Sequence, residues 1–299
     1  QSGQTERLKD HLPASSEIFI FSNFEGDPSM DTALSAIGLA QSEQFDFAVA
    51  LGGGSVMDTA KIASALSRAT GKTNLSDIIG INRLEGQYGI PLIAIPTTAG
   101  TGSEVSPIAI LSEAAEGIKQ SVISSYLIPS IAILDPSLSI TLPKDQTAFT
   151  GVDALVHAME SYLSLRANDY TEALSLRALE LIAGNLLDAY QNGTDLTARA
   201  ALLRGSLLAG IAFSNAGVAA VHALAYPLGG QFKMAHGLAN GLMLLPVMAF
   251  NEGAAPVRMA RLARTLADSL GFVEPNLQKI LSDLCLLYTS PSPRDQRGS

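Results

Sequence analysis

Hydrophobic and polar positions divide the chain into two regions of different texture. Up to residue 135, short apolar runs alternate with stretches of helical spacing. The run at 45–51 is apolar apart from Asp46 and is followed by three glycines, which is typical of a parallel strand buried on both faces. Strands that alternate with helices predict an open, mostly parallel sheet with helices on both faces. The predicted strands are 18–21, 45–51, 91–95, 108–111 and 131–134, and the predicted helices include 29–41 and 58–68.

After residue 136 the chain is rich in Ala and Leu at helical spacing as far as about residue 286. This change predicts an α/β domain over 1–140 and a helical domain over 141–285. Residues 286–299 lose the apolar period and are expected to form a disordered or non-native tail. The span 205–232 has no charged residue, but its Asn215, His222, Pro227 and glycines predict buried helices of a soluble protein rather than a membrane helix.

Composition excludes several classes of protein. With 47% hydrophobic and 16% charged residues, the chain can bury a large core and is not a disordered chain. Its net charge of −9 and pI near 4.9 disfavour a nucleic-acid or anionic-membrane partner. The single cysteine, Cys285, excludes an internal disulfide and a CxxC zinc site. It fits a reducing compartment, and the first ten residues lack the apolar centre of a signal peptide, so a cytoplasmic location is expected.

Two polar loops follow buried strands. Residues 52–55, Gly-Gly-Gly-Ser, lie between a predicted strand and a helix, where the backbone can approach a phosphate and the helix N-terminus supplies N–H groups. Their spacing matches neither GxGxxG nor the P-loop, so a tight turn explains them equally well. Residues 96–104 contain three threonines and a serine among glycines, which could also cap the next helix. Two such loops at strand ends favour a nucleotide site.

A metal site is predicted in the second region. Asp153 and His157 are four residues apart, so both project from one face of a helix, and His222 and His236 follow fourteen residues apart. One carboxylate and three imidazoles can hold a divalent metal and leave a position for an exchangeable ligand. Taken singly, Asp153 could cap a helix and each histidine could be a hydrogen-bonded core residue. The joint case is stronger, because an unpaired ring at His222, in the uncharged span, would cost roughly a few kcal/mol.

Four segments, 52–61, 96–107, 151–164 and 222–241, together closely resemble the iron-containing (group III) alcohol dehydrogenase family. The resemblance covers roughly residues 15–284 and is specific in its combination of motifs. It implies a Rossmann-like N-terminal domain that holds NAD or NADP and an all-α C-terminal domain that holds Fe²⁺, Zn²⁺ or another divalent metal. This is the dehydroquinate synthase-like architecture, with a cleft between the two domains.

The resemblance also implies which residues form the sites. Hydride would pass between the carbinol carbon of a metal-held small alcohol and C4 of the nicotinamide. The implied metal ligands are Asp153, His157, His222 and His236, and the implied cofactor contacts are Gly52, Gly53, Gly54, Ser55, Asp58, Thr97, Thr98, Thr101, Ser103 and Lys119.

This chain departs from the family in two respects. Tyr226 stands where relatives often carry a second histidine, and the segment LLPVMAFN lacks a histidine that often follows LLP. Relatives begin with a further strand and continue with further helices. The resemblance therefore implies a fragment truncated at both ends.

Alternative functions remain open from the sequence. The same scaffold is implied for hydroxyacid–oxoacid transhydrogenases, glycerol dehydrogenases and maleylacetate reductases, whereas the threonine loop and three histidines disfavour dehydroquinate synthase. An inactive remnant that binds only metal or nucleotide is the alternative of a different class. The sequence leaves the alcohol, the metal, the choice of NAD or NADP, and a homo-oligomeric state undetermined.

Overall fold

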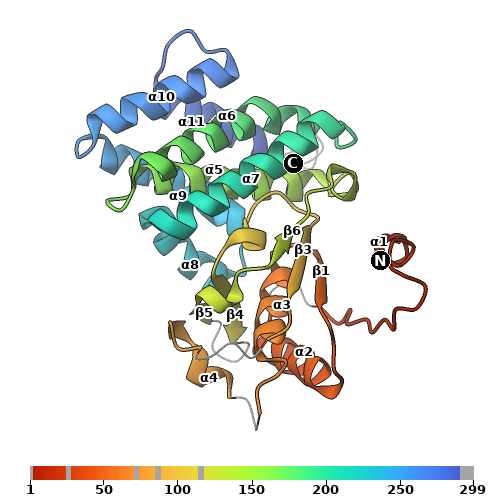
Figure 1. The fold of residues 1–299 in the computed structure, drawn as a ribbon. Coiled ribbons are helices and arrows are strands. Elements are labelled where there is room, and N and C mark those ends of the chain that lie inside the picture. The colour runs from red at the N-terminus through yellow and green to blue at the C-terminus, as the bar shows by residue number, and fades with distance from the viewer. Residues whose placement is uncertain (1–2, 25–27, 71–73, 85–88, 114–117, 290–299) are drawn as a thin grey trace, which may run out of the picture. The chain divides into compact units, whose positions relative to one another are not determined.

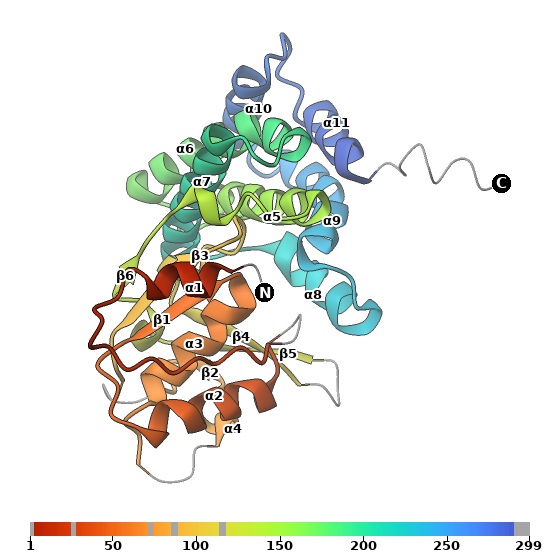
Figure 2. The ribbon, with the colours of Figure 1, turned by 90° about the vertical axis from the view of Figure 1, so that its right-hand side faces the viewer.

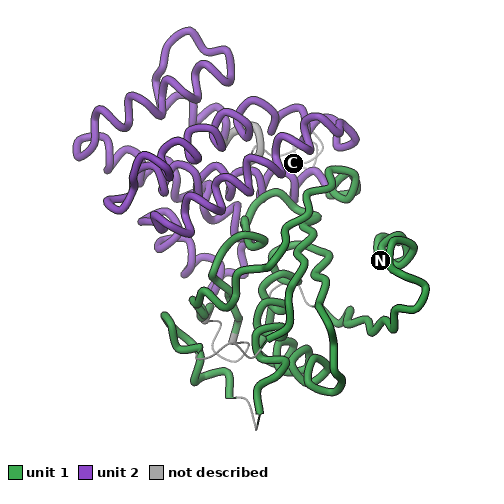
Figure 3. Tube along the Cα trace, in the orientation of Figure 1, with its two compact units in different colours: residues 1–142 green, residues 143–299 purple. Residues whose placement is uncertain are grey.

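The structure is a computed structural model that describes residues 3–24, 28–70, 74–84, 89–113 and 118–289. The chain divides into two compact units, residues 1–142 and 143–299 (Figure 3). The first contains all of the strands among the described residues, and the second is helical. This confirms the predicted fold class, an α/β part followed by an all-α part.

A three-stranded parallel sheet lies at the centre of the first unit. Its order is β1 (Ala48–Gly52), β3 (Leu92–Pro96) and β6 (Ile131–Ala132), with Ala50 opposite Ala94. Helix α3 (Gly54–Leu66) starts directly after β1 and buries Met57 against β1 and β3. The sequence pattern placed the start of α3 four residues too late, because the helix begins within the glycine turn, at Gly54 and Ser55.

The second sheet of this unit differs from the prediction of one mostly parallel sheet. Its order is β2 (Gly80–Ile81), β5 (Ile118–Ile123) and β4 (Ile108–Glu113), and β4 pairs with β5 in antiparallel register. Helices α2 (Met30–Ser42) and α3 lie side by side (Figures 1 and 2), and with α4 (Leu75–Ile78) they enclose a core that includes Ile37, Ile62 and Leu111. Short 3₁₀ turns at Ser103–Val105 and Ser125–Leu127 lie between strands, and a third at Pro136–Leu138 lies between β6 and the first helix of the second unit.

The strand predicted at 18–21 is wrong. After helix α1 (Gln4–Lys9), residues 17–24 have no regular structure, and Ile18, Phe19 and Ile20 are 41%, 44% and 49% exposed. An apolar run becomes a strand only where a neighbouring strand satisfies its N–H and C=O groups, and none of the described residues pairs with this segment.

The second unit is built around helix α5 (Lys144–Leu163), which packs against α6 (Asp169–Gln191), α7 (Leu196–Ala216) and α9 (His236–Glu252) (Figure 1). Residues 151–162 of α5 are all buried. Helix α8 (Ala220–Phe232) packs on α9, and α10 (Pro256–Leu270) and α11 (Leu277–Thr289) pack against each other. A helix buried along this length places any polar side chain it carries inside the unit.

The uncharged span at 205–232 forms parts of two helices rather than one. Helix α7 ends at Ala216, Gly217 adopts a φ of 83°, and α8 begins at Ala220. Among the described residues, α7 alone is long and apolar enough to cross a membrane, and 56% of that apolar window is buried inside the structure. It packs against α5 and α6, which is the arrangement of a core helix in a soluble protein.

The predicted tail starts too early. Helix α11 continues through Thr289, so residues 286–289 of the predicted tail are helical, and its remaining residues, 290–299, lie outside the described residues. Amphipathic spacing, with Leu277, Ile280, Leu281 and Leu284 buried, starts a helix that ends two residues before Pro291.

Candidate functional site

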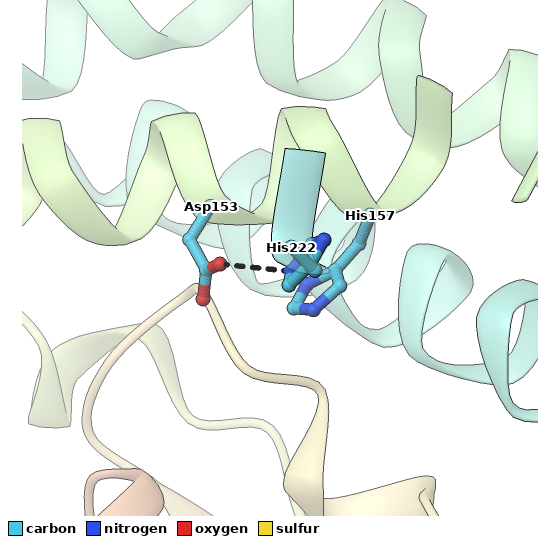
Figure 4. A group of neighbouring side chains, drawn as sticks. All are labelled: Asp153, His157 and His222. Carbon is cyan, nitrogen blue, oxygen red and sulfur yellow. Dashed lines mark ion pairs between the residues drawn. The ribbon is translucent and has the colours of Figure 1, made fainter. Parts of the chain in front are cut away.

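Helix α5 carries three ionisable side chains on one buried stripe. Asp153, His157 and Glu160 stand at positions i, i+4 and i+7, which share a helix face, and they are 3%, 7% and 1% exposed. Figure 4 shows Asp153 and His157 extending from α5 toward His222, the third residue of α8. One ligand atom from each of these three side chains lies within 4.8 Å of the other two.

The fourth predicted metal ligand, His236, is the first residue of α9 and also faces this group. Its Nε2 is 3.5 Å from Asp153 Oδ1, and His222 Nε2 is 3.6 Å from the same oxygen. The rings of His157 and His222 stack at 4.4 Å, and those of His222 and His236 are 5.5 Å apart. The structure therefore brings together all four side chains predicted to hold a metal.

Glu160 is a member of this group that the sequence analysis missed. Its Oε2 accepts hydrogen bonds from His222 Nδ1 at 2.6 Å and from the Ala219 N–H at 2.9 Å, and its Oε1 accepts one from the Val221 N–H at 2.6 Å. The spacing of Asp153, His157 and Glu160 could have revealed it. Glu160 is a third ionisable residue on the same buried face of α5.

Asn240 was also missed. It is fully buried, one turn after His236, and its Nδ2 lies 2.7 Å from Asp153 Oδ1 and 3.3 Å from Nε2 of both His222 and His236. Its Oδ1 is buried without a hydrogen-bond partner among the described residues. The amide nitrogen thus lies where three ligand atoms converge, on the side from which a cation would contact them.

The electrostatics favour a cation at this point. Burial opposes the charge of Asp153, yet the surrounding His157, His236 and His222 lower its pKa. Burial likewise opposes the charge of His222, but hydrogen bonds and charges from Asp153 and Glu160 raise its pKa to about 9. Buried carboxylates that hold imidazoles in their charged form can exchange those protons for a metal. One carboxylate and three imidazoles suit Fe²⁺ or Zn²⁺, so the donor set fits the implied metal.

The predicted cofactor residues lie mainly at one edge of the parallel sheet in the first unit. Gly52 ends β1, Gly53 caps α3, and Gly54 is the first residue of that helix. A Cβ on Gly53 would lie 3.3 Å from Thr98 Cγ2, and one on Gly54 would lie 2.7 Å from Thr101 Cγ2. The threonine loop therefore packs directly against the glycine turn, which leaves no room for a side chain at Gly54.

Hydrogen bonds join the same two loops. The Thr97 N–H donates to Gly52 O at 2.9 Å, and Ser103 Oγ donates to Asp58 Oδ1 at 2.6 Å. Asp58 Oδ2 also accepts from the Ile110 N–H at 2.9 Å, so this carboxylate ties α3 to the loop and to β4. Ser55 belongs to the first turn of α3, whereas Lys119 lies on β5 of the other sheet, apart in topology from the remaining predicted contacts.

Two family models match this chain. Residues 1–136 match the iron-containing alcohol dehydrogenase model, and residues 147–288 match the C-terminal model of the Fe-containing alcohol dehydrogenase family. The chain is also 38% identical over 292 residues to 1-propanol dehydrogenase PduQ of Salmonella typhimurium, covering 94% of this chain and 75% of that protein. The chain belongs to the iron-containing alcohol dehydrogenase family. This confirms the resemblance drawn from its four segments.

One further relative and one solved structure are also similar to this chain. The long-chain-alcohol dehydrogenase 1 of Geobacillus thermodenitrificans is 41% identical over 257 residues, which cover 86% of this chain. This chain spans 64% of that protein's length. Sulfoacetaldehyde reductase from Bifidobacterium kashiwanohense, solved in complex with NAD⁺, is 29% identical with a TM-score of 0.87, over 96% of this chain and 75% of its own.

Proposed function

We propose that this chain carries the metal-binding and dinucleotide-binding parts of an NAD(P)-dependent alcohol dehydrogenase that interconverts a small alcohol and its aldehyde. The observation that carries the proposal is the buried convergence of Asp153, His157 and His222 in the second unit. The relatives named as alcohol dehydrogenases support the same reaction class.

In this proposal Asp153, His157, His222 and His236 hold the metal. When bound, a divalent ion supplies Lewis-acid polarisation of an alcohol or aldehyde oxygen. The four side chains provide the charge and donor atoms for it, and burial of Asp153 and His222 excludes water from their shared side. Their separations of 3.5 and 3.6 Å between the Asp153 carboxylate and two imidazole nitrogens are those of ligands around a common centre.

The glycine turn and the threonine loop hold the dinucleotide in this proposal. The start of α3, with its positive end, favours a pyrophosphate, and Gly52, Gly53, Gly54 and Ser55 let the backbone approach it. Thr97, Thr98, Thr101 and Ser103 then line the same groove, with Asp58 holding the loop in place. Lys119 is retained as a contact to the cofactor ribose, since the resemblance implies it. The predicted domains, 1–140 and 141–285, are proposed as the cofactor-binding and metal-binding parts.

We further propose that the protein acts in the cytoplasm on a small molecule, with neither nucleic acid nor a membrane as its partner. The acidic charge and single cysteine support this assignment. Sedimentation velocity would measure whether the chain forms the homo-oligomer that its family membership allows.

The test is to load the purified chain with Fe²⁺ or Zn²⁺, measure metal stoichiometry and NAD(P) binding, and then follow NAD(P)H absorbance with a panel of short alcohols and aldehydes. Net NAD(P)H formation that requires added metal is expected. Hydride exchange between two substrates without free NAD(P)H would favour the transhydrogenase alternative. No turnover by a chain with both metal and cofactor bound would overturn the proposal and leave the binding-only alternative.

A further inference from the structure

Glu160 joins two features of the second unit that are separate in sequence. Its carboxylate, on α5, accepts hydrogen bonds from the ring of His222 and from two backbone N–H groups at the start of α8. We propose that Glu160 is a positioning residue that fixes both the orientation and the protonated nitrogen of His222. This inference rests on the proposed metal-binding function and extends it to a side chain outside the four ligands.

Glu160 determines which ring nitrogen of His222 faces the metal side. A neutral imidazole carries a proton on one nitrogen and a lone pair on the other. An ionised carboxylate only accepts hydrogen bonds, so the 2.6 Å contact with Glu160 Oε2 holds a proton on Nδ1 of His222. The lone pair of the neutral ring is then on Nε2, the atom that lies 3.6 Å from Asp153 Oδ1.

Glu160 also holds the backbone that carries the ring. The first N–H groups of a helix have no partner within it, and Ala219, the residue that precedes α8, provides no capping side chain. Glu160 supplies the cap from another helix, with one oxygen on the Ala219 N–H and the other on the Val221 N–H. Because the ring and the helix start are held by one buried carboxylate, the position of α8 and the direction of Nε2 are set together.

This role of Glu160 needs its negative charge and not its shape alone. Three donors face Glu160, and a carboxylate can accept from all of them. A Gln side chain has the same shape but one acceptor and one donor group. If its NH₂ faced the ring, Nδ1 of His222 would become an acceptor and the proton would move to Nε2. If it faced Val221, two donors would oppose each other in a buried site.

The experiment compares Glu160→Gln with Glu180→Gln, which makes the same chemical change in an exposed ion pair with Arg177. Affinity for Zn²⁺ is measured by competition with a chromophoric chelator, and thermal unfolding of the metal-free proteins is measured alongside. Glu160→Gln is expected to weaken Zn²⁺ binding by about 10- to 100-fold, the range for lost partners of metal-ligating histidines. Glu180→Gln is expected to change it by less than about twofold, because its partner is a solvent-exposed ion pair.

The outcomes separate this inference from the proposed function. If the wild-type chain binds no Zn²⁺, the proposed function fails. If the wild type binds Zn²⁺ and Glu160→Gln binds it equally well, the positioning role is overturned, even where the variant melts at a lower temperature.

Should Glu160→Gln fail to fold, nitrogen-15 spectra of the Zn²⁺-loaded wild type decide the question. The chain has four histidines, which limits the overlap of ring signals. A proton on Nδ1 supports the inference, and a proton on Nε2 overturns it.

Discussion

Gly237 stands next to His236, the proposed fourth metal ligand, at the start of α9. A Cβ built on Gly237 would lie 1.9 Å from Phe149 O and 2.5 Å from the carbon of the same carbonyl. Both atoms belong to the backbone of the buried helix α5, so no change of side-chain rotamer relieves the overlap. Gly237→Ala must therefore move one helix away from the other.

The size of that movement follows from the distances. An ordinary contact begins at 3.4 Å, so the two backbones must separate by about 1.5 Å, the difference between 3.4 and 1.9 Å. Metal ligands tolerate about 0.2 Å of displacement, and His236 is covalently joined to the residue that moves. Overpacking of this kind typically lowers the free energy of unfolding by about 1–3 kcal/mol. Gly237→Ala is thus expected to lose stability and to bind Zn²⁺ far more weakly.

Urea denaturation and the chelator competition measure the two effects. Gly241→Ala, one turn later on α9, is the matched control, because its Cβ would lie at an ordinary 3.5 Å from Val152 Cγ1. That control is expected to raise helix stability by up to about 1 kcal/mol and to leave Zn²⁺ affinity unchanged. Equal stability and affinity in Gly237→Ala and wild type would refute the close packing of α9 on α5.

Three other predictions address the turn, a buried lysine and the metal. Gly54→Ala should weaken NADH binding, followed by fluorescence titration, by about tenfold, equivalent to about 1.4 kcal/mol of overpacking against Thr101; Thr101→Ser in the same chain should restore it. Burial lowers the pKa of Lys61 from 10.5 to about 8. Between pH 8 and 10.5 the lysine is therefore protonated in the unfolded chain and largely neutral in the folded chain. As the pH rises through this interval, the free energy of unfolding measured in urea should increase by up to about 1.4 kcal/mol per pH unit, and Lys61→Met should lack this slope. Zn²⁺ at a hundred times its Kd should raise the free energy of unfolding by about 2.7 kcal/mol in wild type and not in Asp153→Asn; no shift in wild type would contradict the site.

The sequence predicted those parts of the fold whose signal is local. Continuous apolar runs indicated β1 and β3, and Gly52 to Gly54 marked the turn into α3. Pairing between distant strands left weaker signals. The run at 18–21 is apolar but has no partner among the described residues, and β5 carries Lys119, Gln120 and Ser121, so its strand character comes from its antiparallel partner β4.

The candidate site divides in the same way. Asp153 and His157 were predicted to share a helix face because four residues complete about one turn, and Glu160 could have been added by extending that count. Asn240 could not be found from the sequence alone. A neutral amide in an apolar helix gives little signal, and its contact with Asp153 depends on how α9 packs against α5.

The location of the site at two helix starts explains how the charges are divided. His222 is the third residue of α8 and His236 the first of α9, so the positive ends of both helices face this group. Two positive helix ends would oppose a cation if nothing compensated them. Glu160 accepts hydrogen bonds from the Ala219 and Val221 N–H groups at the start of α8, so its negative charge compensates the positive end of that helix. In the proposed site Asp153 then remains as the carboxylate available to a metal, so the two acids on α5 would have different tasks. Glu160 would neutralise the helix start that holds His222, and Asp153 would provide the charge toward which Nε2 of His222 and of His236 converge.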